Sequence, residues 1–374
     1  MKIDFARMAE ATRLVRSGQL RAATAMIQAA IAGRDSAGPS PAVAPEASSE
    51  VIDVPARVVP SDPQHNRASL SSDVAVNAAP AAAERFLAGS FSNGRDRRDY
   101  KLFIPAQAYD RPLPMVVMLH GCTQDPDDFA AGTGMNEAAA LRGFYVLYPA
   151  QSRRANPQGC WNWFKHSHQQ RDRGEPALLA GMTQEVMRRH RIDAQRVYVA
   201  GLSAGGAMAA ILGDTYPDLY AAVGVHSGLA SGSALDLPSA LSAMKGIGTS
   251  PTGSPNGVPT IVFHGDADAT VHLRNGEHVI AACVDRMATV EVTAVESAGV
   301  RKATRAIYRA ADGRILAERW TVHGAPHAWS GGRSDGSFTD GRGPDASAEM
   351  LRFFFEHPHT GISGEEAVAT RRRA

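Results

Sequence analysis

The sequence lacks several features that would each place it in a special class of protein. It has only three cysteines in 374 residues, Cys122, Cys160 and Cys283, which is too few and the wrong parity for a disulfide-rich scaffold. One bridge with one free thiol and three free thiols are both compatible with that count. No run of 18 apolar residues occurs, so we expect no membrane span.

A charge excess of either sign is also missing. Lysine and arginine number 39 against 38 aspartates and glutamates, and the formal net charge is +1. Such a balance gives no long-range attraction to nucleic acid, so we expect no nucleic-acid partner. The arginines at 371–373 form too short a run to change this, and we interpret them as a solvated chain end.

The N-terminal region does not follow the pattern of a secretion leader. Charged residues interrupt positions 1–16 throughout, and the small apolar run at 22–32 comes after a segment of mixed charge. A leader has a short basic start followed directly by an apolar stretch. The sequence therefore favours a protein without a cleaved leader.

Composition divides the chain into four parts. Residues 1–33 carry apolar residues at helical spacing, broken at Ser17 and Gly18, and predict a short helical hairpin. Residues 34–84 are rich in Pro, Ala and Ser without any period, which predicts a disordered linker. Residues 85–358 alternate strand and helix patterns and predict one large folded domain, with a flexible tail at 359–374.

The large domain predicts an α/β fold with a mostly parallel central sheet and helices on both faces. Several strand candidates are continuous apolar runs, as expected for parallel strands covered on both sides. The predicted strands are 99–104, 115–120, 144–148, 196–200, 221–226, 260–264 and 315–322. The predicted helices are 126–142, 175–191, 204–215, 274–285 and 346–355. Asp312 and Gly313 separate 305–309 from 315–322 and predict a hairpin at a sheet edge.

Residues 201–205, Gly-Leu-Ser-Ala-Gly, carry the strongest chemical signal. They lie between the apolar strand candidate 196–200 and the helix candidate 204–215. A strand, GxSxG and a helix in this order form the nucleophile elbow of serine hydrolases. GxSxG alone is a weak pattern, because a Gly- and Ala-rich turn opening a helix would look the same. In its context it predicts Ser203 as a nucleophile that forms an acyl-serine intermediate.

A serine nucleophile needs an imidazole to take its proton and an acid to hold that imidazole. Two acids, Asp266 and Asp268, follow the strand at 260–264. We favour Asp268 as the catalytic acid and expect Asp266 to hydrogen-bond its own loop as an Asx turn. His327 lies further into the loop after 315–322 than His323, so we predict His327 as the base.

A third motif follows the strand at 115–120. His-Gly-Cys-Thr at 120–123 matches the turns that supply one oxyanion-hole amide, while the residue after the nucleophile supplies the other. We therefore predict the backbone N–H groups of Cys122 and Ala204 as the oxyanion hole. His264 precedes a tight turn, and we expect it to make a structural hydrogen bond.

With these residues the chain resembles the poly(3-hydroxybutyrate) depolymerase family of α/β-hydrolase esterases, which are related to feruloyl and acetylxylan esterases. The similarity covers roughly residues 95–357. The matching pieces are His-Gly-Cys-Thr-Gln at 120–124, Gly-Cys-Trp-Asn-Trp-Phe at 159–164, Gly-Leu-Ser-Ala-Gly-Gly at 201–206, His-Gly-Asp-Ala-Asp at 264–268 and His-Ala-Trp-Ser-Gly-Gly at 327–332. The resemblance implies the same triad and oxyanion amides as the residues do.

The resemblance also implies details that the residue pattern leaves open. It assigns substrate contacts to Trp161, Trp163 and Trp329, and it implies that Cys122 and Cys160 pair beside the active site. The implied substrate is poly(3-hydroxybutyrate) or a related hydroxyalkanoate polyester or oligomer. Feruloyl or acetylxylan esters of plant cell walls are the alternative, because those esterases share the motifs.

Acyl transfer by a serine triad needs no cofactor, and we expect no metal site. A different class of function is a polymer- or granule-binding role of the hairpin at 1–33, which could also mediate self-association. The compartment is left open, because the absence of a leader favours the cytoplasm and the resemblance to secreted enzymes favours the extracellular space.

Overall fold

The computed structural model describes part of the chain. The described residues are 83–94, 96–247, 257–285, 287–296 and 300–359. They belong to one compact unit, residues 76–374. The predicted hairpin at 1–33, all but the last two residues of the predicted linker, and the tail beyond residue 359 lie outside the described residues.

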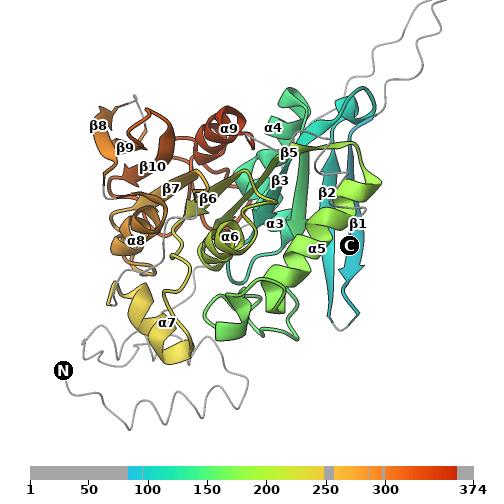
Figure 1. Cartoon of the computed structure of the whole chain (residues 1–374), viewed down its shortest axis with the longest axis horizontal. Helices are drawn as coiled ribbons and strands as arrows, with labels where there is room; N and C mark the ends of the chain where they lie inside the picture. Colours follow the sequence, from blue (N-terminus) through green and yellow to red (C-terminus); the bar gives the residue numbers. More distant parts are fainter. Residues whose placement is uncertain (1–82, 95, 248–256, 286, 297–299, 360–374) are drawn as a thin grey trace, which may run out of the picture. The chain divides into compact units, whose positions relative to one another are not determined.

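Ten strands form one twisted sheet across the molecule (Figure 1). Their order is β1-β2-β4-β3-β5-β6-β7-β10-β9-β8. The bounds are β1 Arg85–Ser92, β2 Arg97–Ile104, β3 Leu113–Leu119, β4 Tyr145–Pro149, β5 Ile192–Leu202, β6 Ala222–His226, β7 Thr260–Gly265, β8 Thr289–Val295, β9 Ala303–Arg309 and β10 Ile315–Val322. The six central strands from β4 to β10 pair in parallel, and β1, β2, β9 and β8 pair antiparallel at the two sides.

Helices cover both faces of this sheet. Their bounds are α3 Pro126–Thr133, α4 Met135–Arg142, α5 Gly174–Arg189, α6 Ala204–Thr215, α7 Leu237–Met244, α8 Arg274–Cys283 and α9 Ala346–Glu356, with short 3-10 turns η1 Ala106–Tyr109 and η2 His166–His168. One apolar core joins the sheet to α5, α6 and α8, and a second core on the other face joins it to α3, α4 and α9. Every residue of β3 is buried, which explains its continuous apolar sequence.

The predicted elements are present with three kinds of difference. The helix predicted at 126–142 is two helices, because Gly134 adopts a left-handed φ of 62° and ends α3. The hairpin of β9 and β10 forms, but it is not the sheet edge, because β8 pairs outside β9. Strands β1 and β8 and helix α7 were not predicted. A short pair of parallel strands, β11 Trp329–Ser330 and β12 Thr339–Asp340, follows β10.

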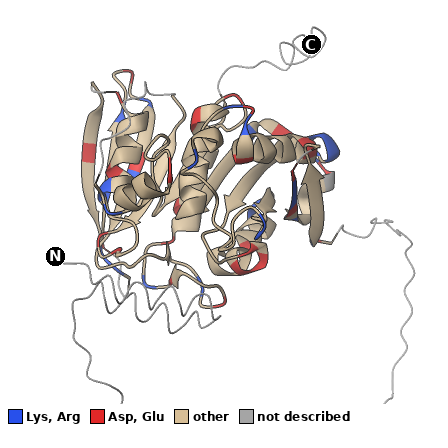
Figure 2. Cartoon of the chain, turned by 90° about the horizontal axis from the view of Figure 1, so that it is seen from below, with Lys and Arg blue, Asp and Glu red and all other residues tan. Residues whose placement is uncertain are grey.

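The parallel arrangement brings the chemical motifs together. The segments that begin at His120, Ser203 and Asp266 follow the carboxyl ends of β3, β5 and β7, and His327 follows β10. Carboxyl ends of parallel strands meet at one edge of a sheet, where ligands bind in open α/β folds. Figure 2 shows that positions of basic and of acidic residues are interspersed along the ribbon of the described chain.

Candidate active site

Ser203 sits in a strained turn between β5 and α6. Its φ of 57° and ψ of −117° are unusual for a residue with a side chain. The Ser203 N–H donates to His226 O at 2.8 Å, which fixes the turn to β6. A methyl group on Gly201 would overlap the Gly205 backbone, and one on Gly205 would overlap Leu119 O. The two glycines of GxSxG are therefore required by close backbone approach.

Asp268 and His327 form a buried pair. Asp268 Oδ2 lies 2.6 Å from His327 Nδ1, and Asp268 Oδ1 accepts the N–H groups of Thr270 and Val271, each at 2.8 Å. Burial raises the pKa of Asp268, but the hydrogen bond and charge of His327 and the amide bonds lower it more, so the net pKa lies below its usual value. The carboxylate therefore stays charged at neutral pH. Because Asp268 holds Nδ1, the other ring nitrogen, Nε2, is the one that His327 has available toward the cavity.

The neighbouring acid and histidine are engaged elsewhere. Asp266 accepts the N–H of Gly324 at 2.6 Å and pairs with His323 Nδ1 at 2.8 Å. His323 Nε2 contacts Thr304 Oγ1 at 2.9 Å, so both ring nitrogens of His323 are occupied. The prediction that Asp266 forms an Asx turn is wrong, because its carboxylate bonds the loop after β10 instead of its own loop. The local amide pattern of an Asx turn occurs at Asp268.

Ser203 and His327 line the same cavity of about 620 Å³. Among the hydrogen bonds of the described residues, none joins their side chains directly. Catalytic hydrogen bonds are often long in sites that hold no substrate. Both residues line the cavity, so both can reach an ester that binds there.

Cys122 and Ala204, whose backbone amides are the predicted oxyanion donors, also line this cavity. Within the described part of the chain, neither amide has a hydrogen-bond acceptor. Ala204 is the first residue of α6, where a helix amide has no partner in its own helix. The amides on either side of Cys122 are bonded, Gly121 to Gln124 Oε1 at 2.9 Å and Thr123 to Gln158 O at 2.8 Å. The structure thus leaves both predicted oxyanion donors free.

The loop at 120–124 after β3 is called the Cys122 loop below. Two links connect it to the segment that follows residue 158. Cys122 and Cys160 form a disulfide, as the family resemblance implied, and Trp161 Nε1 donates to His120 O at 3.0 Å. Trp161 is completely buried and does not line the cavity. Its predicted role as a substrate contact is therefore corrected to one of supporting the loop.

The other two predicted tryptophans differ from each other. Trp163 lines the cavity and packs edge-to-face on Phe164 with ring centroids 5.8 Å apart. Trp329 is buried, stacks on His226 at 5.0 Å and donates to Ser347 Oγ at 3.1 Å. Trp329 belongs to the core behind the active site, so the structure does not support it as a substrate contact.

Two buried histidines brace the site. Burial lowers the pKa of His226 to about 3, so its Nε2 is an acceptor at neutral pH and receives the Ser330 N–H at 2.9 Å. Burial also lowers the pKa of His264, whose Nε2 donates to Val271 O at 2.8 Å. This is the structural hydrogen bond expected for His264. The His226 ring thus links the end of β6 to Ser330, and the His264 ring links β7 to the loop that follows Asp268.

Helix α7 forms an apolar wall of the cavity that sequence analysis missed. Leu237, Leu241 and Met244 lie on one side of this helix and line the cavity. Asp236 caps the helix through a capping box with Ser239. The sequence signals were present, since an N-cap aspartate precedes apolar residues at helical spacing. They were overlooked because α7 has only 8 residues, which gives a short apolar period.

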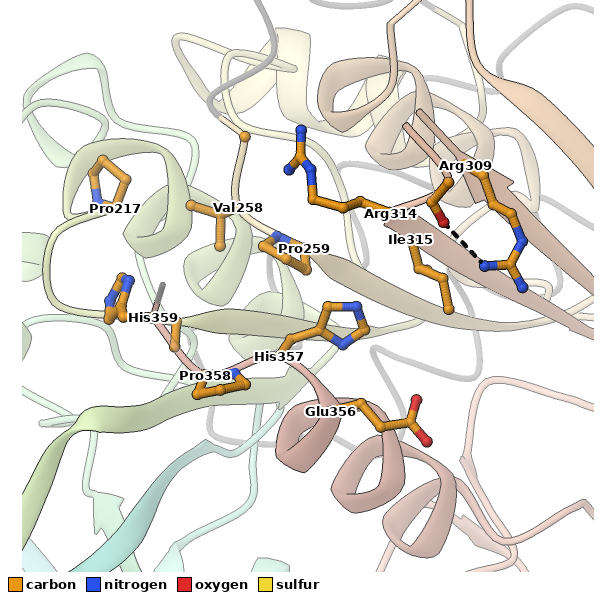
Figure 3. A pocket seen from close by; sticks show the side chains of 13 residues that line it. Pro217, Val258, Pro259, Arg309, Arg314, Ile315, Glu356, His357, Pro358 and His359 are labelled. Carbon is orange, nitrogen blue, oxygen red and sulfur yellow. Dashed lines mark hydrogen bonds between the residues drawn. The ribbon is translucent and has the colours of Figure 1, made fainter. Parts of the chain in front are cut away.

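A second hollow of about 530 Å³ lies at the opposite end of the sheet, by the amino ends of β7 and β10 (Figure 3). Its arginines are engaged within the chain: Arg309 donates to Gly313 O at 3.3 Å, and Arg314 to Asp312 Oδ2 at 2.7 Å. None of the predicted site residues lines it. We therefore place the candidate active site in the cavity beside Ser203.

None of the helices in the described part of the chain combines the length and apolar character that a membrane-spanning helix needs. No group of three or more His, Cys, Asp or Glu side chains in the same part of the chain is arranged to hold a metal ion.

Removing the Cys122–Cys160 disulfide should weaken both stability and activity. The bridge spans 38 residues of sequence, and a loop of that size corresponds to about 4 kcal/mol of unfolding free energy in the chain-entropy model. Replacing both cysteines by serine should lower the melting temperature and reduce kcat about tenfold, because the Cys122 amide loses an anchor. Cys283→Ser is the matched control, and equal stability and kcat in all three proteins would contradict the prediction.

The chain is similar in sequence to known depolymerases and esterases. The family model described as esterase PHB depolymerase matches residues 98–306, which is more than half of the chain. Poly(3-hydroxyalkanoate) depolymerase C of Paucimonas lemoignei is 31% identical over 227 residues, 57% of this chain and 54% of that protein. Feruloyl esterase B of Thermothelomyces thermophilus is 32% identical over 140 residues, 37% of this chain and 47% of that protein. The chain thus spans about half the length of each relative.

A solved structure supports the fold. The acetyl xylan esterase from Aspergillus awamori matches with a TM-score of 0.54 at 19% identity, covering 69% of this chain and 94% of that chain. At this identity the likeness concerns the fold alone. With the parallel sheet, the elbow at Ser203 and the family match over residues 98–306, the chain has the α/β-hydrolase fold and belongs to the esterase PHB depolymerase family.

Proposed function

We propose that the chain is a serine esterase that hydrolyses carboxylic esters through an acyl-Ser203 intermediate. The observation that carries this proposal is the cavity that Ser203, His327, Cys122 and Ala204 all line, with the amides of Cys122 and Ala204 free. Asp268 completes the set through its 2.6 Å contact with His327. Each group that acyl transfer requires is then present at the same place.

The arrangement supports the following steps. His327 Nε2 takes the Ser203 proton while Ser203 Oγ bonds the ester carbon, and the carbonyl oxygen becomes an oxyanion held by Cys122 and Ala204 N–H. Collapse of this adduct breaks the bond to the alcohol, which receives the proton from His327. Water then repeats the sequence on the acyl-enzyme and releases the acid. Asp268 keeps the imidazole oriented and stabilises its positive charge.

We further propose a hydroxyalkanoate polyester or its oligomers as the substrate. The mouth of the cavity carries exposed apolar side chains, with Leu237 56% exposed, Leu241 54% and Phe338 46%. Exposed apolar groups around a site suit an uncharged, apolar polymer surface. The similarity to poly(3-hydroxyalkanoate) depolymerase C points to the same class of ester.

One observation favours an aromatic ester as the second candidate. Trp163 and Phe164 stand edge-to-face on the cavity wall and could stack on the ring of a ferulic acid. The similarity to feruloyl esterase B agrees with this alternative. Relative kcat/KM for methyl ferulate and for hydroxybutyrate oligomers separates the two.

Clearing of an amorphous poly(3-hydroxybutyrate) suspension tests the substrate proposal. We expect wild type to clear the suspension and to cleave p-nitrophenyl butyrate. Leu241→Ser should slow clearing several-fold and leave KM for p-nitrophenyl butyrate within about twofold, since the lost apolar contact serves the polymer. Leu141→Ser on α4 is the matched control, because Leu141 is 84% exposed and lies outside the cavity.

The outcomes test the esterase activity, the polyester substrate and the role of the cavity mouth separately. Butyrate cleavage without clearing would retain the serine esterase and exclude the polyester as substrate. Equal slowing by both leucine variants would remove the role of the cavity mouth. Absence of both activities in the wild type would contradict the esterase itself.

A further inference from the structure

A charged carboxylate is buried behind the Cys122 loop. Glu175, in the first turn of α5, is 2% exposed. Its oxygens accept Asn162 N at 2.7 Å, Asn162 Nδ2 at 2.8 Å and Gln151 Nε2 at 2.5 Å. His168 Nδ1 lies 3.4 Å and Arg98 Nη2 3.7 Å from the same carboxylate. Three hydrogen bonds and two basic side chains therefore surround a group that elsewhere would be in water.

Burying a carboxylate is unfavourable unless its lone pairs are satisfied. Burial raises the pKa of Glu175, but the nearby His168 side chain and the hydrogen bonds from Gln151 and Asn162 lower it more, so the net pKa lies below its usual value. Glu175 is thus ionised at neutral pH. An apolar residue in this place would avoid the desolvation cost, and the charge therefore calls for an explanation beyond packing.

Hydrogen bonds connect the partners of Glu175 to the Cys122 loop. Gln151 N donates to His120 Nε2 at 3.1 Å, and Gln151 Nε2 also donates to Cys160 O at 3.0 Å. Asn162 directly follows Trp161, whose Nε1 donates to His120 O. Glu175 therefore holds Gln151, which bonds both His120 and the Cys160 backbone. It also holds Asn162, whose neighbour Trp161 bonds His120.

We propose that Glu175 is a positioning residue for the oxyanion hole. Its carboxylate fixes Gln151 and Asn162, and these fix His120 and the segment around Cys160, so that the Cys122 N–H points into the cavity. Glu175 is not among the residues that line the cavity and acts through its partners. The inference rests on the proposed esterase function, in which the Cys122 amide stabilises the oxyanion.

Glu175→Gln tests the inference because it keeps the size of the side chain and removes the charge. With p-nitrophenyl butyrate we expect kcat to fall roughly 10- to 100-fold and KM to stay within about twofold, since losing a whole oxyanion donor costs about 100- to 1000-fold. The inhibition constant of butylboronic acid should rise by the same factor as kcat falls. Its boron bonds Ser203 Oγ and becomes tetrahedral, so its affinity reports the oxyanion hole.

Three controls make the experiment decisive. Glu185→Gln removes the same charge from the same helix, where Glu185 pairs with Arg188 and Arg189 at the surface. It should leave kcat and the inhibition constant of butylboronic acid unchanged. Asn162→Ala removes the Nδ2 bond to Glu175 and keeps the backbone one, and should lower kcat about three- to tenfold. It also removes two longer side-chain bonds, to Ala155 O at 3.4 Å and from Asn156 Nδ2 at 3.3 Å. It decides the question if Glu175→Gln does not fold. Ser203→Ala reports the esterase proposal separately.

Each outcome has a defined meaning. A parallel change of kcat and of boronic acid affinity supports the positioning role. Unchanged kcat, or a lower kcat with unchanged boronic acid affinity, overturns it and leaves Glu175 as a part of the fold. Full activity of Ser203→Ala would instead overturn the proposed function on which the inference rests.

Discussion

Replacing Ser203 by alanine should lower kcat for p-nitrophenyl butyrate by roughly 10⁴- to 10⁶-fold, because the nucleophile is lost while the other groups stay in place. The substitution should preserve the fold. The strained φ of 57° and ψ of −117° is held by the bond from Ser203 N to His226 O and by the packing of Gly201 and Gly205, none of which involves the hydroxyl. We therefore expect the side chain at this position to serve chemistry rather than structure.

Covalent labelling provides a measurement that does not depend on turnover. An alkyl phosphonofluoridate should add one phosphonyl group to wild type at Ser203, with loss of fluoride, and intact-mass spectrometry should detect it. Ser203→Ala should remain unlabelled. Ser231→Ala is the control, because Ser231 Oγ donates to Asp214 and lies outside the cavity. Labelling of Ser203→Ala, or residual activity near the wild-type value, would show that another residue is the nucleophile.

The local sequence was sufficient to predict the elbow. The glycines at 201 and 205 exist because backbone atoms of β3, β5 and α6 approach each other closely, and that requirement appears in the sequence as GxSxG. The continuous apolar runs likewise predicted the central strands, because both faces of those strands are covered. Features that leave a recognisable pattern in the local sequence were therefore predictable.

Features that depend on tertiary pairing were harder to predict from the sequence. The roles of Trp161 and Trp329 depend on which face of a loop each ring occupies, and no local pattern encodes that. Strand β1 has the sequence RFLAGSFS, which is rich in small residues and gains its strand conformation by pairing with β2. Strand β8 is an exposed edge strand, and it too depends on its neighbour.

Glu175 illustrates the same limit at the site. In sequence it is an acidic residue in the first turn of a helix, where acids are common because of the helix dipole. Only the folded chain brings Gln151 and Asn162 to its carboxylate and connects it to His120. Residues that act through others leave little trace in a single sequence, whereas residues that react follow recognisable motifs.

The two candidate acids offer the sharpest test of how the triad is assembled. Asp268→Asn should lower kcat roughly 10³- to 10⁴-fold, because an amide cannot stabilise the imidazolium of His327 or hold its correct tautomer. Asp266→Asn is the same substitution two residues away. Asp266 pairs with His323, whose Nε2 is already engaged by Thr304, so this variant should change kcat less than about threefold.

Stability should separate from activity in these variants. Both carboxylates have pKa values below the usual range in the folded protein, so each contributes stability above the pKa of an unfolded aspartate, about 3.9. Each asparagine variant should therefore unfold more easily at neutral pH, and the difference in unfolding free energy from wild type should shrink as the pH falls below about 4. Denaturant titrations at pH 7 and pH 3, beside kcat at pH 7, provide the measurement. If Asp266→Asn lost as much kcat as Asp268→Asn, the assignment of Asp268 as the partner of the catalytic base would be wrong, because the two variants share the stability loss and only one touches His327.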